Sequence, residues 1–570
     1  MLTQESSALI ENLEEYSPLL KRIFQRRGIV SKFELSKELS CLLPYESMLN
    51  INLASQRLAL AVENNQRILI IGDFDADGAT STALAVRVLR DFGVYHVDFL
   101  VPNRFEYGYG LTPEIVEVAK QKQPHLIVTV DNGISSHAGV ERANQLGIDV
   151  IITDHHLPGL MLPKAYTIVN PNQAEDQFSS KNLAGVGVIF YVMVALRNEL
   201  NNRDWFLKNK LQHPNLAKYL DLVALGTIAD LVKLDQNNRI LVHQGLERIR
   251  KGATCPGILA LLETAKRSPF KLSASELGFI IAPRLNAAGR LDDMSLGINC
   301  LLSNDSTTAL TIAQELNRLN LERRSIEHQM QEEALTLVSH LDLKNQEQLG
   351  VCLFDETWHQ GIIGLVASKI KDKIYRPTIA FAKAEESYLK GSARSIPGIH
   401  IRDILAIIDS KHPNLIDRFG GHAMAAGLSL AAKNYKFFNE ILNLTLHQHS
   451  DLKLFTPKVE TDGQLTCEEL TLQTAELLKE QGPWGQGFSE PLFEGVFQVI
   501  HQKIVGEKYL KLKLKQDGYI ISAIVFNINQ NQLDQTYKKI HCIYRLEINE
   551  YKGQKNLELI IESIVEVLNE

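Results

Sequence analysis

Acidic residues and histidines gather in three short stretches of the N-terminal half of this sequence. GDFDADG contributes Asp73, Asp75 and Asp77, VDNG contributes Asp131, and TDHH contributes Asp154, His155 and His156. Carboxylates held close together repel one another unless cations neutralise them. Carboxylate oxygens with one or two imidazoles suit Mn²⁺ or Mg²⁺ better than a soft metal. Two such ions about 3.5–4 Å apart would activate water and stabilise a phosphoryl-transfer transition state.

The elements that must position these residues are predicted to be alternating strands and helices. Continuously apolar stretches begin at Arg67, Val97, Leu126 and Asp149, with helical stretches between them. This pattern predicts a parallel sheet covered on both faces, hence an α/β doubly wound domain. Ligands of such sheets bind outside the carboxyl ends of the strands, where the three motifs stand. We therefore expect the acidic residues and histidines to converge on one edge of the sheet.

A structural alternative exists for each acidic residue taken alone. A single aspartate after a strand is usually a helix cap or a turn residue. Three strand ends with acidic residues in one domain make that alternative poor for the set. Asp73 is the weakest member, because it could instead orient a neighbouring group.

The whole sequence predicts five successive segments. Residues 1–50 form a helical lead-in, 51–235 the metal-binding domain, 236–341 a helical connector with one long helix, 342–455 a smaller α/β lobe, and 456–570 a β-barrel of the OB type. The barrel is predicted from short alternating strands, namely KYLKLKLK, YIISAIVF, IHCIYRLEINE and LELIIESIVEVL. The fold class is thus α/β and multidomain, with a C-terminal β-barrel.

The three motifs, in this order and spacing, resemble the first three motifs of the DHH phosphoesterase superfamily. LVALGTIADLV resembles the fourth motif and supplies Asp230. The resemblance implies metal ligands at Asp75, Asp77, Asp131, His155 and Asp230. It also implies that His156 faces the substrate and assists catalysis, and that Asp154 supports the histidines. Asp73 is grouped with these two as a catalytic residue.

Longer stretches resemble the RecJ family of single-stranded-DNA exonucleases within that superfamily. These are PRLNAAGRL, WHQGIIGLVASKI, GSARSIPG, FGGHAMAAGLSL and PWGQGFSEPLF. The resemblance makes the smaller lobe a DHHA1 domain that binds substrate. The candidate residues are Arg284, Arg290, Arg394, Ser395, Gly420, Gly421 and His422. Arginine can clamp a terminal 5′ phosphate, and a Gly-Gly backbone can approach one closely. The alternatives are an Arg290 ion pair with Asp292 or Asp293 and an ordinary tight turn.

A basic stretch near the C-terminus indicates nucleic-acid binding despite the net charge of −7. Lys511, Lys513 and Lys515 alternate and so share one face of a strand, with Tyr509, Tyr519 and Tyr544 interleaved. An OB barrel with a basic groove and stacking aromatics suits single-stranded DNA. The alternative is a solvated strand face.

The resemblance implies hydrolysis of single-stranded DNA from its 5′ end to mononucleotides, in recombination and repair. Expected cofactors are two divalent cations, Mn²⁺ or Mg²⁺, and single-strand-binding protein is an expected partner of a monomeric enzyme. The sequence contains no apolar run of about 18 residues and begins without a secretory pattern, so we expect a cytoplasmic protein. Alternatives are a DHH phosphoesterase for short RNA or small nucleotides, and a DNA-binding scaffold with an inactive nuclease core.

Overall fold

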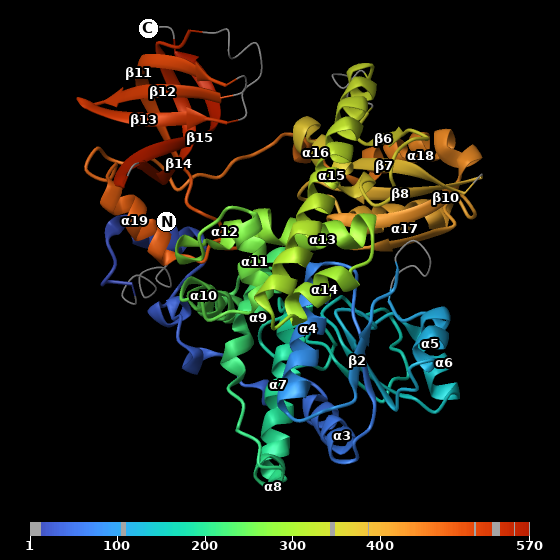
Figure 1. Ribbon diagram of the computed structural model, residues 1–570. Helices are drawn as coiled ribbons and strands as arrows, with labels where there is room; N and C mark the ends of the chain where they lie inside the picture. The colour runs from blue at the N-terminus through green and yellow to red at the C-terminus, as the bar shows by residue number, and fades with distance from the viewer. Residues whose placement is uncertain are drawn as a thin grey trace, which may run out of the picture. The chain divides into compact units, whose positions relative to one another are not determined.

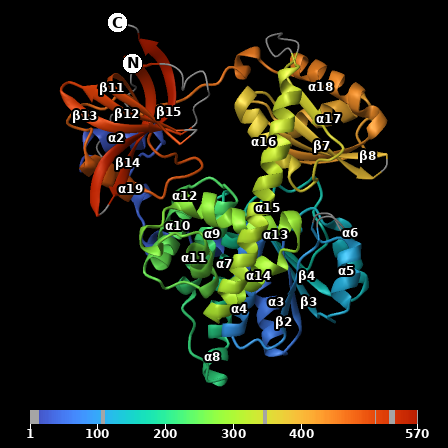
Figure 2. The ribbon, with the colours of Figure 1, turned by 45° about the horizontal axis from the view of Figure 1, so that its top comes forward.

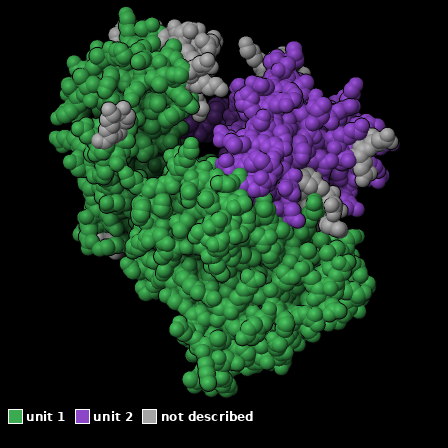
Figure 3. All heavy atoms as spheres, viewed as in Figure 1, with its two compact units in different colours: residues 1–286, 294–314, 460–570 green, residues 287–293, 315–459 purple. Residues whose placement is uncertain are grey.

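The computed structural model describes residues 13–103, 110–341, 348–385, 387–506, 509–526, 536–551 and 553–568. The chain divides into two compact units, coloured separately in Figure 3. Unit 1 comprises residues 1–286, 294–314 and 460–570, and unit 2 comprises residues 287–293 and 315–459. None of the helices in the described ranges combines the length and apolar character that crossing a bilayer requires.

A five-stranded parallel sheet in the order β2-β1-β3-β4-β5 is the centre of the first part of unit 1 (Figure 1). Its strands are β1 (Ile68–Ile71), β2 (Val97–Leu100), β3 (Leu126–Val130), β4 (Asp149–Thr153) and β5 (Thr167–Val169). The strand order reverses between β1 and β3, because the chain adds β2 on one side of β1 and β3 on the other. This is the switch point at which doubly wound sheets bind ligands. The predicted parallel α/β lobe is confirmed.

Helices cover both faces of this sheet. Helices α5 (Pro113–Lys120) and α6 (His137–Gln145) bury one face, and the apolar core between them and the sheet includes Ile71, Ile127 and Ile152. Helices α3 (Ile51–Glu63), α4 (Ala76–Asp91) and α7 (Gly185–Asn202) contact the other face. Strands β1, β3 and β4 are therefore buried on both sides, which explains why the sequence shows continuous apolar runs there rather than alternation. The edge strand β2 is partly exposed.

Unit 1 continues as a mostly helical region. Its elements are α8 (Trp205–Lys208), α9 (Leu220–Ala229), α10 (Gln236–Arg250), α11 (Pro256–Thr264), α12 (Ala274–Glu276), α14 (Ser295–Leu302) and the first half of α13 (Ala282–Leu291). Residues of α13 from Ala287 on belong to unit 2. The predicted long helix is α15 (Ser306–Ser339), about 51 Å long at 1.5 Å per residue. The lead-in is less helical than expected. Between residues 13 and 50 it has helix α2 (Pro18–Arg26) and single 3₁₀ turns at Lys32–Leu35, Leu39–Cys41 and Tyr45–Ser47.

Unit 2 contains a second sheet, which is mixed rather than parallel, in the order β6-β7-β8-β10-β9. Its strands are β6 (Val351–Phe354), β7 (Thr378–Glu385), β8 (Tyr388–Arg394), β9 (Arg418–Gly421) and β10 (Ala425–Ala431). Helix α16 (Ile363–Ile374) packs on one face with residues of α15 such as Met330. Helices α17 (Ile401–Lys411) and α18 (Tyr435–His449) cover the other face.

The C-terminal part of unit 1 is a closed barrel in the order β11-β12-β13-β15-β14, beside helix α19 (Leu472–Gln481) (Figure 2). Its strands are β11 (Phe493–Val505), β12 (Tyr509–Gln516), β13 (Tyr519–Val525), β14 (Lys539–Tyr551) and β15 (Gln554–Leu568). Along β12, every second residue is buried, which confirms the predicted alternation. Strand β11 was not among the predicted strands. Its pairing with β12 is irregular between Val499 and His501, which breaks the alternation.

Candidate metal centre

The loop after β1 brings three aspartates to the carboxyl edge of the sheet. Asp75 caps helix α4, because its Oδ1 accepts a hydrogen bond from Gly78 N at 3.0 Å. Gly78 permits a tight loop, since a Cβ there would lie 2.5 Å from the Asp73 carbonyl oxygen. Asn286 Oδ1 accepts a hydrogen bond from Ala76 N at 2.8 Å and fixes the start of the helix. Backbone contacts thus hold the loop in place.

Asp77 lies in the first turn of α4 and is 1% exposed. Its two carboxylate oxygens accept hydrogen bonds from Gly185 N at 2.6 Å and from Val186 N at 2.9 Å. These donors are the first amides of helix α7, whose terminal N–H groups have no partners within the helix. The carboxylate is thereby oriented by two helices that lie over the same face of the sheet.

Asp131 follows β3 in a left-handed backbone conformation, with φ of 61°. A non-glycine residue in this region is uncommon, and such strain is found preferentially at functional sites. A Cβ added to Gly185 would lie 2.5 Å from Asp131 Cβ, so this glycine leaves the space that the aspartate occupies. The carboxylate is buried, with 2% of the residue exposed.

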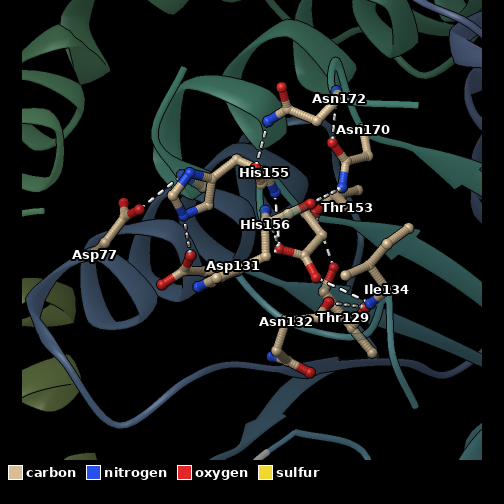
Figure 4. A network of polar contacts seen from close by, with 12 residues as sticks. Asp77, Thr129, Asp131, Asn132, Ile134, Thr153, His155, His156, Asn170 and Asn172 are labelled. Atoms are coloured by element: carbon tan, nitrogen blue, oxygen red, sulfur yellow. Dashed lines mark hydrogen bonds and ion pairs between the residues drawn. The ribbon is translucent and has the colours of Figure 1, made fainter. Parts of the chain in front are cut away.

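The two histidines after β4 are held by their backbone as well as by their rings (Figure 4). Asp154 Oδ1 lies 2.7 Å from His156 Nδ1, and Asp154 Oδ2 accepts a hydrogen bond from Ile134 N at 2.9 Å. Asn172 Nδ2 donates to the His155 carbonyl at 2.6 Å, and Asn170 Nδ2 donates to that of His156 at 2.9 Å. The two rings therefore have fixed positions, with their centroids 4.5 Å apart.

Asp230 reaches the same place from a helix end rather than a strand end. It is the C-cap of α9, and its Oδ2 lies 3.5 Å from His155 Nε2. Asp131 Oδ1 lies 3.1 Å from the same nitrogen. Three overlapping groups have ligand atoms within 4.8 Å of one another: Asp131 with His155 and His156, Asp77 with His155 and Asp230, and Asp73 with Asp75 and Asp131. The structure thus brings together all the acidic residues and histidines that the sequence assigned to this edge.

The electrostatics of the cluster fit a cationic ligand. Burial, reinforced by the charge of nearby aspartates, raises the pKa of Asp77 and that of Asp230 to about 7. The same causes raise the pKa of Asp131 well above its ordinary value. Burial lowers the pKa of His155, so its imidazole is neutral at pH 7, the form that binds metals. Buried carboxylates around a neutral imidazole are a donor set that a divalent cation would compensate.

Asp154 and His156 behave as a separate pair. Burial alone would raise the pKa of Asp154, but the hydrogen bond and charge of His156 lower it to about 2. Burial alone would lower the pKa of His156, but the hydrogen bond and charge of Asp154 raise it to about 9. At neutral pH, this pair is therefore an imidazolium beside a carboxylate.

The substrate-binding candidates are divided between the two units. Arg284 lies on α13 in unit 1 and donates to the Ile280 carbonyl. Arg290 belongs to unit 2 and donates to the Gly361 carbonyl at 3.1 Å. Gly361 precedes α16, and a Cβ on Gly364 of that helix would lie 2.8 Å from Arg394 Nη2. Arg290 and Arg394 are therefore both tied to the start of α16.

The glycine-rich turns of unit 2 meet at one end of its sheet. Arg394 pairs with Ala425 in the β8–β10 register, and Ser395 N donates to the Met424 carbonyl at 2.9 Å. A Cβ on Gly421, whose φ is 139°, would lie 2.5 Å from the Ala425 carbonyl oxygen. Gly421 is thus required by the fold, whereas the same construction at Gly420 meets no atom within 4 Å. His422 N donates to Ala425 O at 2.7 Å.

The basic face of the barrel is only partly as predicted. Lys511, Lys513 and Lys515 are exposed on one face of β12, and Lys513 Nζ lies 2.7 Å from Ser522 Oγ. Tyr509 and Tyr519 are exposed, at 42% and 61%. Tyr544 is 1% exposed and packs on Phe497 inside the barrel, so the expectation that it could contact bases is wrong.

Several residues that complete the centre were missed by the sequence analysis. They are Asn170, Asn172, Gly185 and Asn286, which orient the aspartates and histidines described above. Asn170 and Asn172 stand in VNPN directly after β5, another strand end at the same edge. That position was the available signal. Asn286 lies within PRLNAAGRL, in which the sequence analysis predicts a role only for the two arginines.

Three family models match the chain in succession. They are the DHH family N-terminal domain over residues 67–227, the DHHA1 domain over residues 346–448 and the RecJ OB domain over residues 461–563. The chain is similar to the single-stranded-DNA-specific exonuclease RecJ of Escherichia coli, with 49% identity over 96% of both chains. It is 33% identical to that of Bacillus subtilis, over 96% of this chain and 67% of the relative.

Solved structures show the same likeness. The crystal structure of RecJ from Thermus thermophilus in complex with Mn²⁺ matches with a TM-score of 0.81 and 29% identity, over 98% of this chain and 78% of that one. A complex with Mg²⁺ from the same organism matches with a TM-score of 0.75 and 27% identity, over 98% and 76%. The motifs, the three domain matches and the 49% identity over nearly the full length show the family. The chain belongs to the RecJ family of DHH proteins.

Proposed function

We propose that this protein is a single-stranded-DNA-specific exonuclease that hydrolyses phosphodiester bonds from the 5′ end, releases 5′ mononucleotides and acts in recombination and repair. The observation that carries the proposal is the intact cluster of acidic residues and histidines at the sheet edge. It occurs in a chain that shares 49% identity over nearly its full length with a relative named for this activity. A binding scaffold would have no need of a buried set of carboxylates with raised pKa values.

The proposed metal ligands are Asp75, Asp77, Asp131, His155 and Asp230. We infer two cations, because Asp131 is common to two of the three overlapping groups and His155 to another two, so these residues could serve two neighbouring ions. Bound Mn²⁺ or Mg²⁺ supplies positive charge to the oxygens on which negative charge develops during in-line attack. Asp73 is 4% exposed and would orient neighbouring ligands.

His156 is the proposed acid–base residue of the protein itself. Asp154 accepts from Nδ1, which fixes the ring and keeps the imidazole protonated near neutral pH. Its other nitrogen, Nε2, would donate a hydrogen bond to a phosphate oxygen and hold a proton for the leaving 3′ oxygen. The geometry of Asp154, held by Ile134 N, serves this orientation.

Two further regions would bind the DNA. In unit 2, the proposed site for the terminal 5′ phosphate comprises Arg290, Arg394, Ser395, Gly420, Gly421 and His422. Arg284, in unit 1, is proposed separately as a substrate-binding residue. On the barrel, Lys511 and Lys513 are proposed to contact the backbone and Tyr509 to stack on bases. A monomer that cooperates with single-strand-binding protein is the proposed working form.

The proposal is tested with three substrates labelled at the 3′ end: single-stranded DNA, its blunt duplex and RNA of the same sequence. We expect progressive shortening of the single-stranded DNA alone, dependent on Mn²⁺ or Mg²⁺ and abolished by chelator. Comparable cleavage of the RNA, or of very short oligomers only, would keep the metal chemistry and overturn the assigned substrate. Binding without cleavage would favour a scaffold.

A further inference from the structure

The stretch PWGQGF, which precedes the barrel, forms a tight turn against the catalytic lobe. Gly485 N donates to the Phe488 carbonyl at 2.9 Å, and Phe488 N donates back at 3.1 Å. Gly487, at the third position of this turn, has φ of 70°, which glycine adopts without strain. The first barrel strand begins shortly after Phe488, at Phe493. The turn therefore lies at the entry of the chain into the barrel.

Aromatic rings and arginines stack across this turn. The Trp484 and Phe488 rings are parallel within 15°, with centroids 4.8 Å apart. Arg27 Cζ lies 5.3 Å from the centroid of Trp484, and Arg239 Cζ lies 4.3 Å from that of Phe488. The stack joins helix α10 to the end of α2, two elements that are far apart in the sequence. Cation–π contacts are strongest where both partners are shielded from water, as Arg239 and Phe488 are.

The barrel side of the stack is held by a buried ion pair. Arg27 binds both carboxylate oxygens of Asp462, at 2.8 and 3.1 Å, and both side chains are 6% exposed. Asp462 Oδ2 also accepts from Leu492 N at 3.1 Å, immediately before β11. The start of the barrel is thus tied to the same stack.

The other side of the turn contacts the segment that follows Asp230. Leu234 N donates to the Gln486 carbonyl at 2.7 Å. The backbones approach closely, because a Cβ on Gly487 would lie 2.4 Å from Lys233 Cγ. Leu234 itself is 1% exposed. This anchored position follows Asp230 by about one helical turn's worth of chain.

Arg239 completes the attachment. Its Nη1 donates to the Leu234 carbonyl at 2.8 Å, and its Nη2 donates to the Glu34 carbonyl at 2.7 Å. The residue is 7% exposed, and both of these bonds run to backbone rather than to a carboxylate. A planar guanidinium can stack on Phe488 and bridge two carbonyls at once, which a lysine cannot do.

Asp230 depends on such support more than the buried Asp131 does. It caps a helix instead of ending a strand, and the next residue, Leu231, has φ of 58° and is 66% exposed. The side chain of Asp230 is 25% exposed, against 3% for Asp131. The turn and Arg239 hold the chain at Lys233 and Leu234, and Asn238 Nδ2 also donates to the Lys233 carbonyl at 2.9 Å.

We propose that Arg239 and the 484–488 turn position Asp230. The contacts of this turn with the chain after Asp230 would then determine how tightly the catalytic centre binds its divalent cation. This inference rests on the proposed role of Asp230 as a metal ligand. Groups that orient metal ligands without touching the ion commonly change affinity by about 10–100-fold when mutated.

The test is Arg239→Lys in the full chain, with Mn²⁺ binding measured by isothermal titration and Mn²⁺ activation of single-stranded DNA cleavage measured in parallel. We expect Mn²⁺ affinity to fall about tenfold. The KM for DNA should stay unchanged, and kcat should recover at saturating Mn²⁺. A loss of kcat that excess Mn²⁺ does not restore would overturn the inference.

Arg57→Lys is the matched control. Arg57 is also 7% exposed, lies over the Tyr166 ring and binds Asp149 at 2.8 Å, but Asp149 begins β4 at the opposite edge of the sheet. This variant should lose a similar amount of thermal stability and keep wild-type Mn²⁺ affinity. Equal weakening of Mn²⁺ binding in both variants would assign the effect to general destabilisation and reject the inference.

Gly487→Ala provides a second route if Arg239→Lys folds poorly, because the added methyl presses on Lys233 from the turn. It should also weaken Mn²⁺ binding; wild-type affinity in this variant would count against the inference. Asp230→Asn separates the two levels of the argument. If Asp230→Asn leaves Mn²⁺ affinity intact, the proposed ligand set fails. If it weakens binding while Arg239→Lys does not, only the positioning role fails.

Discussion

The sheet edge of the catalytic lobe and the outer face of the barrel use charged residues in opposite ways. At the sheet edge, Asp77, Asp131 and Asp154 are at most 2% exposed, and each is held by backbone amides or tight packing. On the barrel, Lys511 is 45% exposed in its side chain and lies 3.5 Å from Glu558. A buried charge costs free energy unless its partners are placed accurately, whereas an exposed charge stays hydrated and is screened by salt.

This contrast predicts how each region responds to mutation. Changes at the sheet edge should be large and strongly interdependent, because its residues share partners. Changes on the barrel should be small, additive and dependent on ionic strength. The following experiments test the contrast in order of expected effect.

Asp131→Ala should have the largest effect. The carboxylate belongs to two of the three candidate metal groups, so its loss removes the proposed bridge. Removing a single preorganised electrostatic group already costs about 10²–10³-fold in kcat, and we expect at least this loss. Cleavage rates and binding of single-stranded DNA by fluorescence anisotropy are measured together. Binding should stay close to wild type; loss of both activities at once would indicate misfolding and contradict the separation of the two regions.

His156→Ala should lower kcat by about 10²–10⁴-fold, the usual contribution of a general acid or base.

Asp154→Asn provides a sharper test, because it should change how kcat depends on pH. Asp154 raises the pKa of His156 from 6.5 to about 9, so the wild type keeps the imidazolium until the pH rises through about 9. Without the Asp154 charge, burial lowers the pKa of His156 with less opposition, so the variant should lose the imidazolium at a lower pH than the wild type. The ratio of variant to wild-type kcat should therefore fall as pH rises from 6.5 to about 9. Parallel pH profiles would show that the pair has no role in proton transfer.

Metal removal should affect stability with a defined pH dependence. The pKa of Asp77 and that of Asp230 are raised from 3.8 to about 7, so the metal-free folded protein binds more protons than the unfolded chain in that window. The stability that these groups contribute is complete below pH 3.8 and lost as pH rises through about 7. Mn²⁺ at about 100 times its Kd should add about 2.7 kcal/mol.

Thermal unfolding with chelator or with Mn²⁺ measures this effect across the same window. Stabilisation by Mn²⁺ should be larger at about pH 8 than at about pH 5.5, since cations and protons compete for the same carboxylates. A stabilisation that is independent of pH would place Mn²⁺ binding elsewhere on the protein. Asp131→Ala is the control, because it should show little stabilisation at either pH.

The fold class and the residues at the sheet edge could be predicted because short, contiguous stretches of sequence determine both. Asp75, Asp131 and His155 stand within four residues of the ends of apolar strands, and the carboxyl ends of parallel strands lie at one edge of the sheet. Asp230 lies far along the chain from these motifs, at a helix end, and only the family resemblance identified it. Single orienting residues such as Asn172 have no spacing rule. Tyr544 is buried because the strands close into a barrel, and the pattern of nearby lysines in the sequence does not predict which aromatic side chains point inward.

The smallest expected effect belongs to the barrel. Lys513→Ala should weaken binding of single-stranded DNA only a few-fold at moderate salt and reduce the slope of log K against log salt by about 0.7, the contribution of one phosphate contact. Lys511→Ala should have a similar effect, and the effects of the two changes should add. Lys208→Ala, which changes an exposed lysine on α8, is the control and should leave the slope unchanged. Anisotropy titrations over a salt series give the slopes. Since Lys513 Nζ lies 2.7 Å from Ser522 Oγ, an unchanged slope would mean that the lysine is occupied within the sheet and that this face is merely solvated. A changed slope with an unchanged kcat on short oligomers would show that the exposed face and the buried edge contribute separately to the reaction.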